Sequence, residues 1–280
     1  MSSAEGPRRH FIIPDTQTRP GVPLDHLDWI GAYLADKKPD VVIHLGDHWD
    51  FPSLNGYEEP GSVPLEGARY ADDLHVGNEA FKRLCLPMEA EIERMKRNKE
   101  KQWKPRKIFL VGNHEARADR VANNNPKFVG TIGSDQCDIR DWERIPFLKP
   151  IEVDGIFYCH YFSNVGTGKP IGGQVGNRLS KVNASFIQGH EQGKQDGNKV
   201  TSTGRTLYGL VLGSCYLHIE PYRGPHQRHW RGVMVLNEVK DGEYDRTEVS
   251  LSYLCRKYEN MPLRDFCKLK YPNGEWDHLA

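Results

Sequence analysis

Five short apolar stretches that each end in a polar side chain constrain the fold of this chain more than any other feature. They span residues 11–15, 41–47, 108–113, 156–160 and 185–190. Their length and their content of valine, isoleucine and phenylalanine predict buried β-strands. Open α/β sheets bind ligands at the carboxyl ends of their strands, so we expect the polar ends of these strands to converge on one site.

The segments between these strands predict the helices of an α/β fold. Residues 23–38 place apolar side chains at helical spacing, and Pro23 suits a first helical turn. A strand, a helix and a second strand in this order predict a right-handed parallel crossover. Residues from about 52–105 are expected to form a helical insertion, in which a loop rich in glycine and proline precedes a helix that Pro87 kinks or divides.

The last third of the chain is predicted to be rich in β-strands. Residues 206–213, 231–239 and 248–254 each carry a strand-length apolar pattern. Asp241 and Gly242 suit a tight turn between the last two of these segments. Those two strands are therefore expected to form a hairpin.

Composition excludes several classes of protein. The 280 residues carry 38 lysines and arginines against 38 aspartates and glutamates, which argues against a strongly basic nucleic-acid-binding domain and against an acidic, solvating chain. Hydrophobic residues make up 38%, enough for a core, and we expect a single domain over residues 1–280. No apolar run is long enough for a membrane span and the six cysteines form no Cys-x-x-Cys pair, so a cytoplasmic protein that does not bind membranes is expected.

Polar side chains at the five strand ends combine the donor types of a divalent-metal site. They are Asp15, Gln17, Asp47, Asp50, Asn113, His114, His160, His190 and Gln192. Carboxylate, imidazole and amide donors together suit manganese, iron, zinc or magnesium more than all-sulfur or all-imidazole donors would. Two such ions, bridged by one carboxylate, would activate water and stabilise an in-line displacement at phosphorus.

Two motifs at these strand ends carry a resemblance to a known family. Gly46-Asp47-His48-Trp49-Asp50 matches the Gly-Asp-x-x-Asp motif of calcineurin-like metallophosphoesterases, and Gly112-Asn113-His114-Glu115 matches their Gly-Asn-His-Glu motif. The chain resembles this family, in the order and spacing of its motifs, from Asp15 to Gln192, about two-thirds of its length. The resemblance implies an α/β fold of the metallophosphoesterase type, a four-layer α/β/β/α sandwich, with a site for two divalent metal ions.

The resemblance also implies roles for individual residues. Asp47 would bridge the two ions, with Asp15, Gln17 and Gln192 at the first ion and Asn113, His160 and His190 at the second. His114 would act as a general acid or contact the phosphate, and Asp50 would orient its imidazole. That pairing is chemically reasonable, because a carboxylate fixes the tautomer of an imidazole and raises its basicity.

Three positions depart from the family pattern. Gln17 and Gln192 stand where the family usually has histidines, so the first ion is expected to bind weakly and to favour manganese or magnesium. Phe51 stands where protein phosphatases of the family carry a phosphate-binding arginine. Because this arginine is missing, a nucleotide or nucleic-acid substrate is favoured over a phosphoprotein. Arg117 could replace the arginine in binding phosphate, or it could form an ordinary salt bridge.

These features together predict a hydrolase, a metal-dependent phosphoesterase that uses metal-activated water. Its substrate is expected to be a phosphodiester or phosphomonoester of a nucleotide or nucleic acid, as for a phosphatase, phosphodiesterase or nuclease. Manganese is the first choice of cofactor, ahead of magnesium, zinc, iron and nickel. The alternatives are a catalytically weak protein that binds a phosphorylated ligand, a protein phosphatase, and a structural protein. Residues 230–233 and the final hairpin resemble phosphoesterases encoded by bacteriophages, which would place the protein in the cytoplasm of a host cell.

Overall fold

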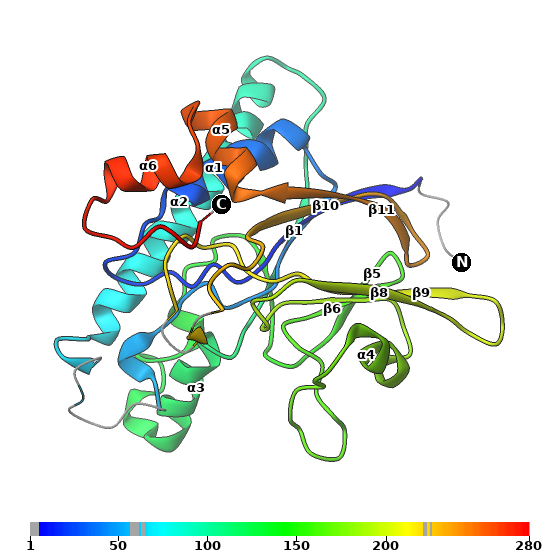
Figure 1. Ribbon diagram of the computed structural model, residues 1–280, viewed down its shortest axis with the longest axis horizontal. Helices are drawn as coiled ribbons and strands as arrows, with labels where there is room; N and C mark the ends of the chain where they lie inside the picture. Colours follow the sequence, from blue (N-terminus) through cyan, green and yellow to red (C-terminus); the bar gives the residue numbers. More distant parts are fainter. Residues whose placement is uncertain (1–5, 57–61, 63–64, 221–222, 225, 280) are drawn as a thin grey trace.

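Two stacked β-sheets, with helices on the outer face of each, form the described part of the chain. The computed structural model describes residues 6–56, 62, 65–220, 223, 224 and 226–279. Figure 1 shows the two sheets lying between layers of helices. The predicted α/β class and the α/β/β/α order of layers are thus confirmed.

The first sheet holds six strands in the order β11-β10-β1-β2-β3-β4. Its strands are β1 (Arg8–Ile13), β2 (Val41–His44), β3 (Arg106–Leu110), β4 (Glu143–Ile145), β10 (Gly232–Lys240) and β11 (Glu243–Ser250). The strands β1 to β4 run parallel, with helix α1 (Asp25–Lys37) between β1 and β2, which confirms the predicted parallel crossover. The strands β10 and β11 form the predicted hairpin, and Asp241 and Gly242 at its turn both have positive φ.

The second sheet holds five strands in the order β5-β6-β7-β9-β8. Its strands are β5 (Ile151–Val153), β6 (Ile156–Cys159), β7 (Phe186–Gln188), β8 (Gln195–Val200) and β9 (Thr206–Val211). The strands β6, β7 and β9 run parallel, and β5 and β8 pair antiparallel at the two edges. Because β6 and β7 are the fourth and fifth predicted strands, the polar strand ends come from two facing sheets and not from one sheet edge.

An apolar core fills the space between the two sheets. Ile12 and Ile43 of the first sheet share this core with Leu210 of the second, and all three are fully buried. Phe11 and Ile13 alternate with Ile12 along β1 and belong to the core under the helices instead. Both faces of the central strands are therefore covered, which explains why these strands are continuous apolar runs in the sequence.

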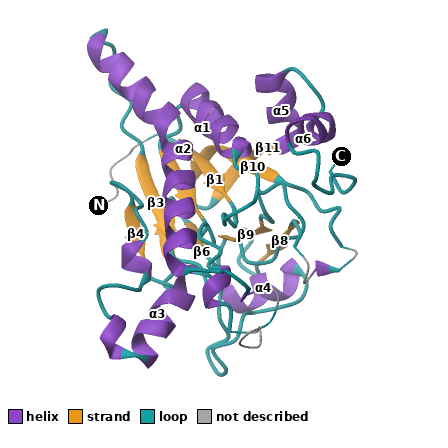
Figure 2. Cartoon of the chain, turned by 90° about the vertical axis from the view of Figure 1, so that its left-hand side faces the viewer, coloured by secondary structure: helices purple, strands orange, loops and turns teal. Residues whose placement is uncertain are grey.

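Helices cover the outer face of each sheet (Figures 1 and 2). On the first sheet lie α1, α2 (Tyr70–Arg97), α5 (Leu251–Glu259) and α6 (Leu263–Lys270). Helix α4 (Val175–Val182) covers the second sheet, and α3 (Glu115–Asn124) begins beside the strand ends. The described residues also include the short 3₁₀ helices η1 (Pro52–Leu54), η3 (Pro126–Phe128) and η4 (Ser134–Gln136). In the part of the chain that the structure describes, no helix is long and apolar enough to cross a membrane.

Most of the predicted insertion over 52–105 is the helix α2. The residues 57–61, 63 and 64 of that insertion lie outside the described residues. The expectation that Pro87 starts a second helix is wrong, because α2 runs without interruption past it. Leu84 and Met88 on either side of Pro87 are fully buried in the core under the helices. This packing compensates for the backbone hydrogen bond that the helix loses at the proline.

The predicted strand over residues 248–254 is wrong in its second half. The strand β11 ends at Ser250, and α5 begins at the next residue. The Ser250 hydroxyl accepts a hydrogen bond from the backbone N–H of Tyr253, 3.1 Å away, and so caps the helix. Apolar residues alternate with serines from Val249 onward, and this period-two pattern is also typical of a strand.

Acid should destabilise the fold through His26 on α1. This histidine is buried, and neither ring nitrogen has a partner among the described residues. Burial, with the nearby His218, lowers the pKa of His26 to about 3. The unfolded state takes up a proton below its ordinary pKa near 6.5 and the folded state does not, so stability present at pH 7 is lost as the pH falls. Between pH 7 and pH 5 this amounts to about 2 kcal/mol.

Urea unfolding of the wild type and of a His26→Gln variant at pH 7 and pH 5 tests this expectation. The variant should lose less stability between the two pH values than the wild type. His75→Gln, at an exposed position of α2, is the matched control and should keep the wild-type pH dependence. An equal pH dependence in all three proteins would contradict the burial of an uncharged His26.

Candidate metal centre and active site

The carboxyl ends of strands from both sheets meet at one place and bring the predicted metal ligands together. Asp15 follows β1, Asp47 follows β2, Asn113 follows β3, and His160 and His190 follow β6 and β7. A hydrogen bond of 3.1 Å joins the backbone N–H of His190 to Asp15 Oδ1 across the two sheets. The strand ends therefore position these five side chains before any ligand is bound.

Asp47, His160 and His190 could hold a metal ion, because one ligand atom from each lies within 4.8 Å of the others. Asp47 Oδ2 is 3.3 Å from His160 Nε2. Asn113 Oδ1 lies 2.9 Å from His160 Nε2 and 2.7 Å from His190 Nδ1. One carboxylate, one amide oxygen and two imidazoles thus converge on a common point, a donor set that suits a divalent transition metal.

The tautomer of His160 favours binding of a cation. Its Nδ1 lies 2.8 Å from the Leu45 carbonyl oxygen, which can only accept, so Nδ1 carries a proton and Nε2 faces Asp47. Burial disfavours the charged imidazole, but the Asp47 carboxylate, together with Asp15 and the Leu45 carbonyl oxygen, outweighs burial and raises the pKa of His160 to about 9. A cation would replace the proton that this environment otherwise keeps on Nε2.

Asp15 provides a second indication of a cation. It is fully buried, and its Oδ2 atom has no hydrogen-bond partner among the described residues. Burial raises the pKa of Asp15 to about 7. A buried carboxylate oxygen without a donor is costly unless a positive charge compensates it, and a metal ion beside Asp15 would do so.

The loop that carries Asp47 turns sharply because of a glycine. Gly46 has a φ of +96°, and a Cβ atom there would lie 2.6 Å from the Leu110 carbonyl oxygen. Asp47 itself has a φ of +51°. Only glycine fits at position 46 without strain, which explains the glycine of the Gly-Asp-x-x-Asp pattern.

Glu115 holds the two motif loops together, a role that was not predicted and that only its place in the second motif could have indicated. Its carboxylate is fully buried and accepts four backbone hydrogen bonds. Oε2 accepts from Asp47 at 3.0 Å and from Gly112 at 2.8 Å. Oε1 accepts from His48 at 2.6 Å and from Trp49 at 3.0 Å. Glu115 therefore fixes the backbone from which Asp47 projects.

His114 lies beside the metal ligands and is held by Asp50. Asp50 Oδ1 is 2.6 Å from His114 Nδ1. Asp50 Oδ2 accepts a hydrogen bond of 2.5 Å from Arg19, and this contact of Arg19 had not been predicted. His114 Nε2 lies 3.7 Å from Asp47 Oδ2. Burial disfavours the charged imidazole, but Asp47 and Asp50 outweigh it and raise the pKa of His114 above its ordinary value.

Arg117 lies at the same place, on the first turn of α3. Its Nη1 donates to the Asp50 carbonyl oxygen at 2.9 Å, and its Nη2 is 3.1 Å from His114 Nε2. Arg117 Nη1 is also 3.9 Å from Asp50 Oδ1, so the salt bridge weighed as the alternative is present in a long form. The guanidinium nevertheless reaches the catalytic nitrogen expected of His114, where a phosphoryl oxygen could contact it.

Gln17 and Gln192, the two predicted amide ligands of the first ion, are hydrogen-bonded to each other. Gln192 Nε2 donates to Gln17 Oε1 at 3.0 Å. Gln192 Oε1 accepts from the Tyr216 hydroxyl at 2.5 Å and from Arg223 Nη1 at 3.3 Å. An ion at this position would compete with protein donors for both amide oxygens, and their role as ligands stays a prediction.

A cavity of about 510 Å³ opens beside the metal ligands. We call it the site cavity. It is lined by Leu54, Gly56, Asn113, Arg117, Arg120, Val121, Asn124, Phe147, Tyr161, Pro170 and His190. Because Asn113 and His190 belong to both the cavity and the metal-ligand group, a molecule bound in the cavity would reach the metal centre.

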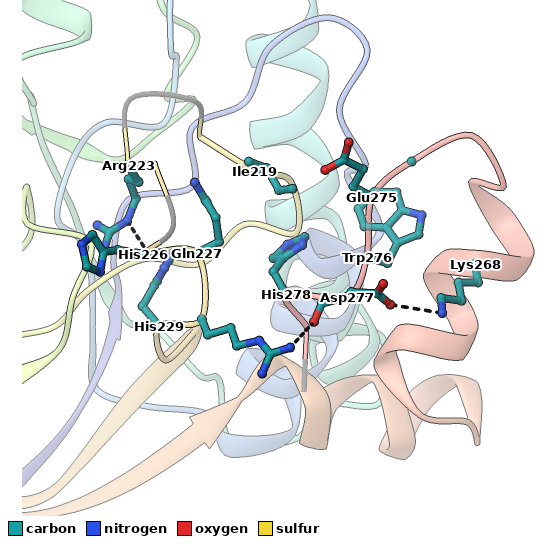
Figure 3. A pocket seen from close by; sticks show the side chains of 12 residues that line it. Ile219, Arg223, His226, Gln227, His229, Lys268, Glu275, Trp276, Asp277 and His278 are labelled. Atoms are coloured by element: carbon teal, nitrogen blue, oxygen red, sulfur yellow. Dashed lines mark hydrogen bonds and ion pairs between the residues drawn. The ribbon is translucent and has the colours of Figure 1, made fainter.

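A second cavity, of about 820 Å³, lies between the loop before β10 and the C-terminal segment (Figure 3). Its basic side chains bind groups of the chain itself. Lys268 pairs with Asp277 at 3.2 Å, and Arg228 donates to the Asp277 carbonyl oxygen at 3.4 Å. Arg223 Nε donates to the His226 carbonyl oxygen at 3.1 Å. None of the candidate metal ligands lines this second cavity, so a phosphate bound there would not reach the metal centre as one in the site cavity would.

Comparison with known proteins does not identify the function of this chain. No protein-family model and no curated protein matches the chain. One similar solved structure is that of YfcE, described as a phosphoesterase from E. coli, with a TM-score of 0.36 and 12% sequence identity over 86% of this chain and 100% of that chain. A likeness this low does not bear on function, which has to be inferred from the site residues.

Proposed function

We propose that the chain is a metal-dependent phosphoesterase. The single observation that carries the proposal is the convergence of Asp47, His160 and His190 within 4.8 Å at the meeting point of the two sheets. The His114–Asp50 pair lies directly beside this group. A carboxylate and two imidazoles can bind a divalent metal ion, and the buried acid–base pair beside them can transfer a proton. Hydrolysis of a phosphate ester requires both of these functions.

The chain offers ligands for two cations. Asp47, Asn113, His160 and His190 would hold one ion. Asp15 and Asp47, with Gln17 and Gln192 as weaker donors, would hold the other, and manganese suits this mixture of donors. A divalent ion there supplies Lewis acidity that polarises a phosphoryl oxygen and activates water.

His114 would supply the proton for the leaving group. Asp50 holds its Nδ1 atom at 2.6 Å, which leaves Nε2 to face the metal ligands. Arg117 can only donate at Nε2, so Nε2 would take up a proton once Arg117 has moved away from it. As the bond between phosphorus and the leaving oxygen breaks, Nε2 would give this proton to that oxygen, and the Asp50 carboxylate would stabilise the orientation of the ring. Arg117 would move from Nε2 to a phosphoryl oxygen and neutralise its charge.

The substrate would be a phosphodiester or phosphomonoester of a nucleotide or nucleic acid. Phe51 is fully buried and stacks on Tyr70 with ring centroids 5.5 Å apart, so it belongs to the core and contributes no phosphate contact. Arg117 is then the cation nearest to His114, and a phosphoprotein substrate is disfavoured.

Turnover by chelator-stripped protein tests this function. Manganese, magnesium, zinc or nickel is added back, with p-nitrophenyl phosphate and bis-p-nitrophenyl phosphate as substrates. We expect metal-dependent hydrolysis of these esters. With an alkyl phosphate ester, whose leaving alkoxide needs a proton that p-nitrophenolate does not need, His114→Ala should lower the rate by roughly 10²-fold or more, the usual contribution of a general acid. His75→Ala, at an exposed position, is the matched control and should keep the wild-type rate. No turnover with any ion would contradict the proposal.

A catalytically weak protein that binds a phosphorylated ligand is the second candidate, and the Gln17–Gln192 pair favours it. Replacing both glutamines by histidine is expected to add a second tightly bound manganese ion per chain, because imidazole is a better donor than an amide. Elemental analysis after gel filtration measures this number. Gln102→His, on an exposed loop, is the control and should bind no additional ion. Hydrolysis that appears only in the double variant would favour the binding protein over the enzyme.

A further inference from the structure

We propose that the site cavity binds a nucleoside unit that carries a second phosphate, with its base against Phe147 and Tyr161 and its distal phosphate at Arg120. This proposal rests on the proposed function, since it places the scissile phosphate at the metal ligands. It narrows the substrate to a phosphate ester with an aromatic base and a further anionic group. The support comes from two groups of residues that line the cavity, one aromatic and one basic.

One wall of the site cavity is a row of aromatic rings that starts at the metal ligands. The rings of His190 and Tyr161 have centroids 4.6 Å apart, and those of Tyr161 and Phe147 are 5.5 Å apart at 84°. Tyr161 is buried and Phe147 is half-buried, so the row runs from the interior to the mouth of the cavity. Aromatic side chains placed in this way bind bases through their π-faces without regard to base identity.

The lining of the site cavity also includes the face of α3 that carries basic and amide side chains. Arg117, Arg120 and Asn124 follow one another at spacings of three and four residues, which puts them on one side of the helix, and Asn113 lies just before its first turn. Arg117 is bound to Asp50 and reaches His114. Arg120 is exposed, and no group within the described ranges forms a hydrogen bond or ion pair with it. Its guanidinium is therefore available to an anion one helical turn beyond the scissile phosphate.

The size of the site cavity also fits a nucleotide. A volume of about 510 Å³ lies within the usual range of small-molecule pockets, roughly 300–1,000 Å³. With one phosphate at the metal ligands, the base and the sugar would fill the space between Tyr161 and α3. The second phosphate would then reach Arg120 near the mouth.

A series of three diesters with the same leaving group tests the proposal on manganese-loaded protein. The esters are ethyl p-nitrophenyl phosphate, thymidine 5′-(p-nitrophenyl phosphate) and thymidine 3′-phosphate 5′-(p-nitrophenyl phosphate). We expect kcat/KM to rise about tenfold with the nucleoside and about tenfold again with the 3′-phosphate, as stacking and a charged hydrogen bond are gained. Phe147→Ala should abolish the first gain, and Arg120→Gln should abolish the second.

The matched control is Arg97→Gln, which removes an exposed arginine at the C-terminal end of α2 and should preserve both gains. Isothermal titration with thymidine 3′,5′-bisphosphate gives a readout that does not depend on turnover. Binding should be at least about tenfold tighter than that of inorganic phosphate, and Arg120→Gln should remove most of the difference.

The outcomes separate this proposal from the proposed function. Equal kcat/KM values for the three esters would overturn the nucleoside site and leave the phosphoesterase intact. Absence of turnover of every ester, together with tight binding of the bisphosphate that depends on Arg120, would overturn the phosphoesterase and support the site. Bisphosphate binding no tighter than that of phosphate would overturn the nucleoside site in either case.

Discussion

Replacement of Glu115 by alanine is expected to lower the free energy of unfolding by about 4 kcal/mol or more, since four buried donors would each lose their acceptor at roughly 1–3 kcal/mol. The four donors are the backbone N–H groups of Asp47, His48, Trp49 and Gly112. Water cannot easily replace the carboxylate, because the side chain is fully buried. Urea unfolding at pH 7 measures the loss.

Two further variants make this prediction specific. Glu115→Gln keeps the shape and one oxygen acceptor but turns an amide NH₂ group toward two of the donors, so an intermediate loss is expected. Glu143→Ala removes an exposed carboxylate that pairs with Arg106 at 2.8 Å and should cost less than about 1 kcal/mol. Equal stabilities of the two alanine variants would show that Glu115 does not hold the motif loops.

The strands that end at the site were predictable because they are buried on both faces. The run from Val41 to Ile43 contains no polar residue that would indicate an exposed face, and the first polar side chain, His44, is the last residue of the strand. The division of these strands between two sheets was not predictable from the runs. The division depends on which strand faces pack into a common core, as the faces that carry Ile12 and Leu210 do. The arrangement in two sheets was instead implied by the resemblance to a family.

The C-terminal helices were missed for a local reason. The sequence from Val249 to Leu254 has both a period-two pattern and a helical one, and hydrophobic periodicity alone does not separate them over so few residues. The Ser250 cap favours the helix. Burial of Leu251 and Leu254 in the core between the first sheet and its helices stabilises the helix further. Serine in a short alternating segment is better treated as a cap than as an exposed strand position.

The convergence of the candidate ligands at one place was predictable, and the contacts that support them were not. Each candidate ligand follows an apolar run, so its place at a strand end can be inferred from the chain alone. The contacts of Arg19 with Asp50 and of Arg223 with Gln192 join loops that are far apart in the sequence. Nothing in the local pattern of either arginine distinguishes it from a solvated charge.

Replacement of Asp47 by asparagine is expected to have the largest effect on metal binding. Asparagine keeps the shape and an oxygen near the backbone N–H of His114, which donates to Asp47 Oδ1 at 2.9 Å. The negative charge that faces His160 and His114 is lost. Even replacement of groups behind the ligands costs roughly 10–100-fold in metal affinity, so about 100-fold or more is expected here.

Titration with manganese measures the affinity, and thermal unfolding with and without a chelator gives an independent readout. Metal bound only to the folded state stabilises it, so chelation should lower the Tm of the wild type and leave the Tm of Asp47→Asn unchanged. Asp141→Asn, at an exposed position that pairs with Lys107, is the matched control and should respond to the chelator like the wild type. If Asp47→Asn binds manganese as tightly as the wild type and still loses stability on chelation, the ion is held elsewhere. The proposed phosphoesterase would then lack its metal centre, because among the described residues Asp47 is the carboxylate that has a ligand atom within 4.8 Å of both His160 and His190.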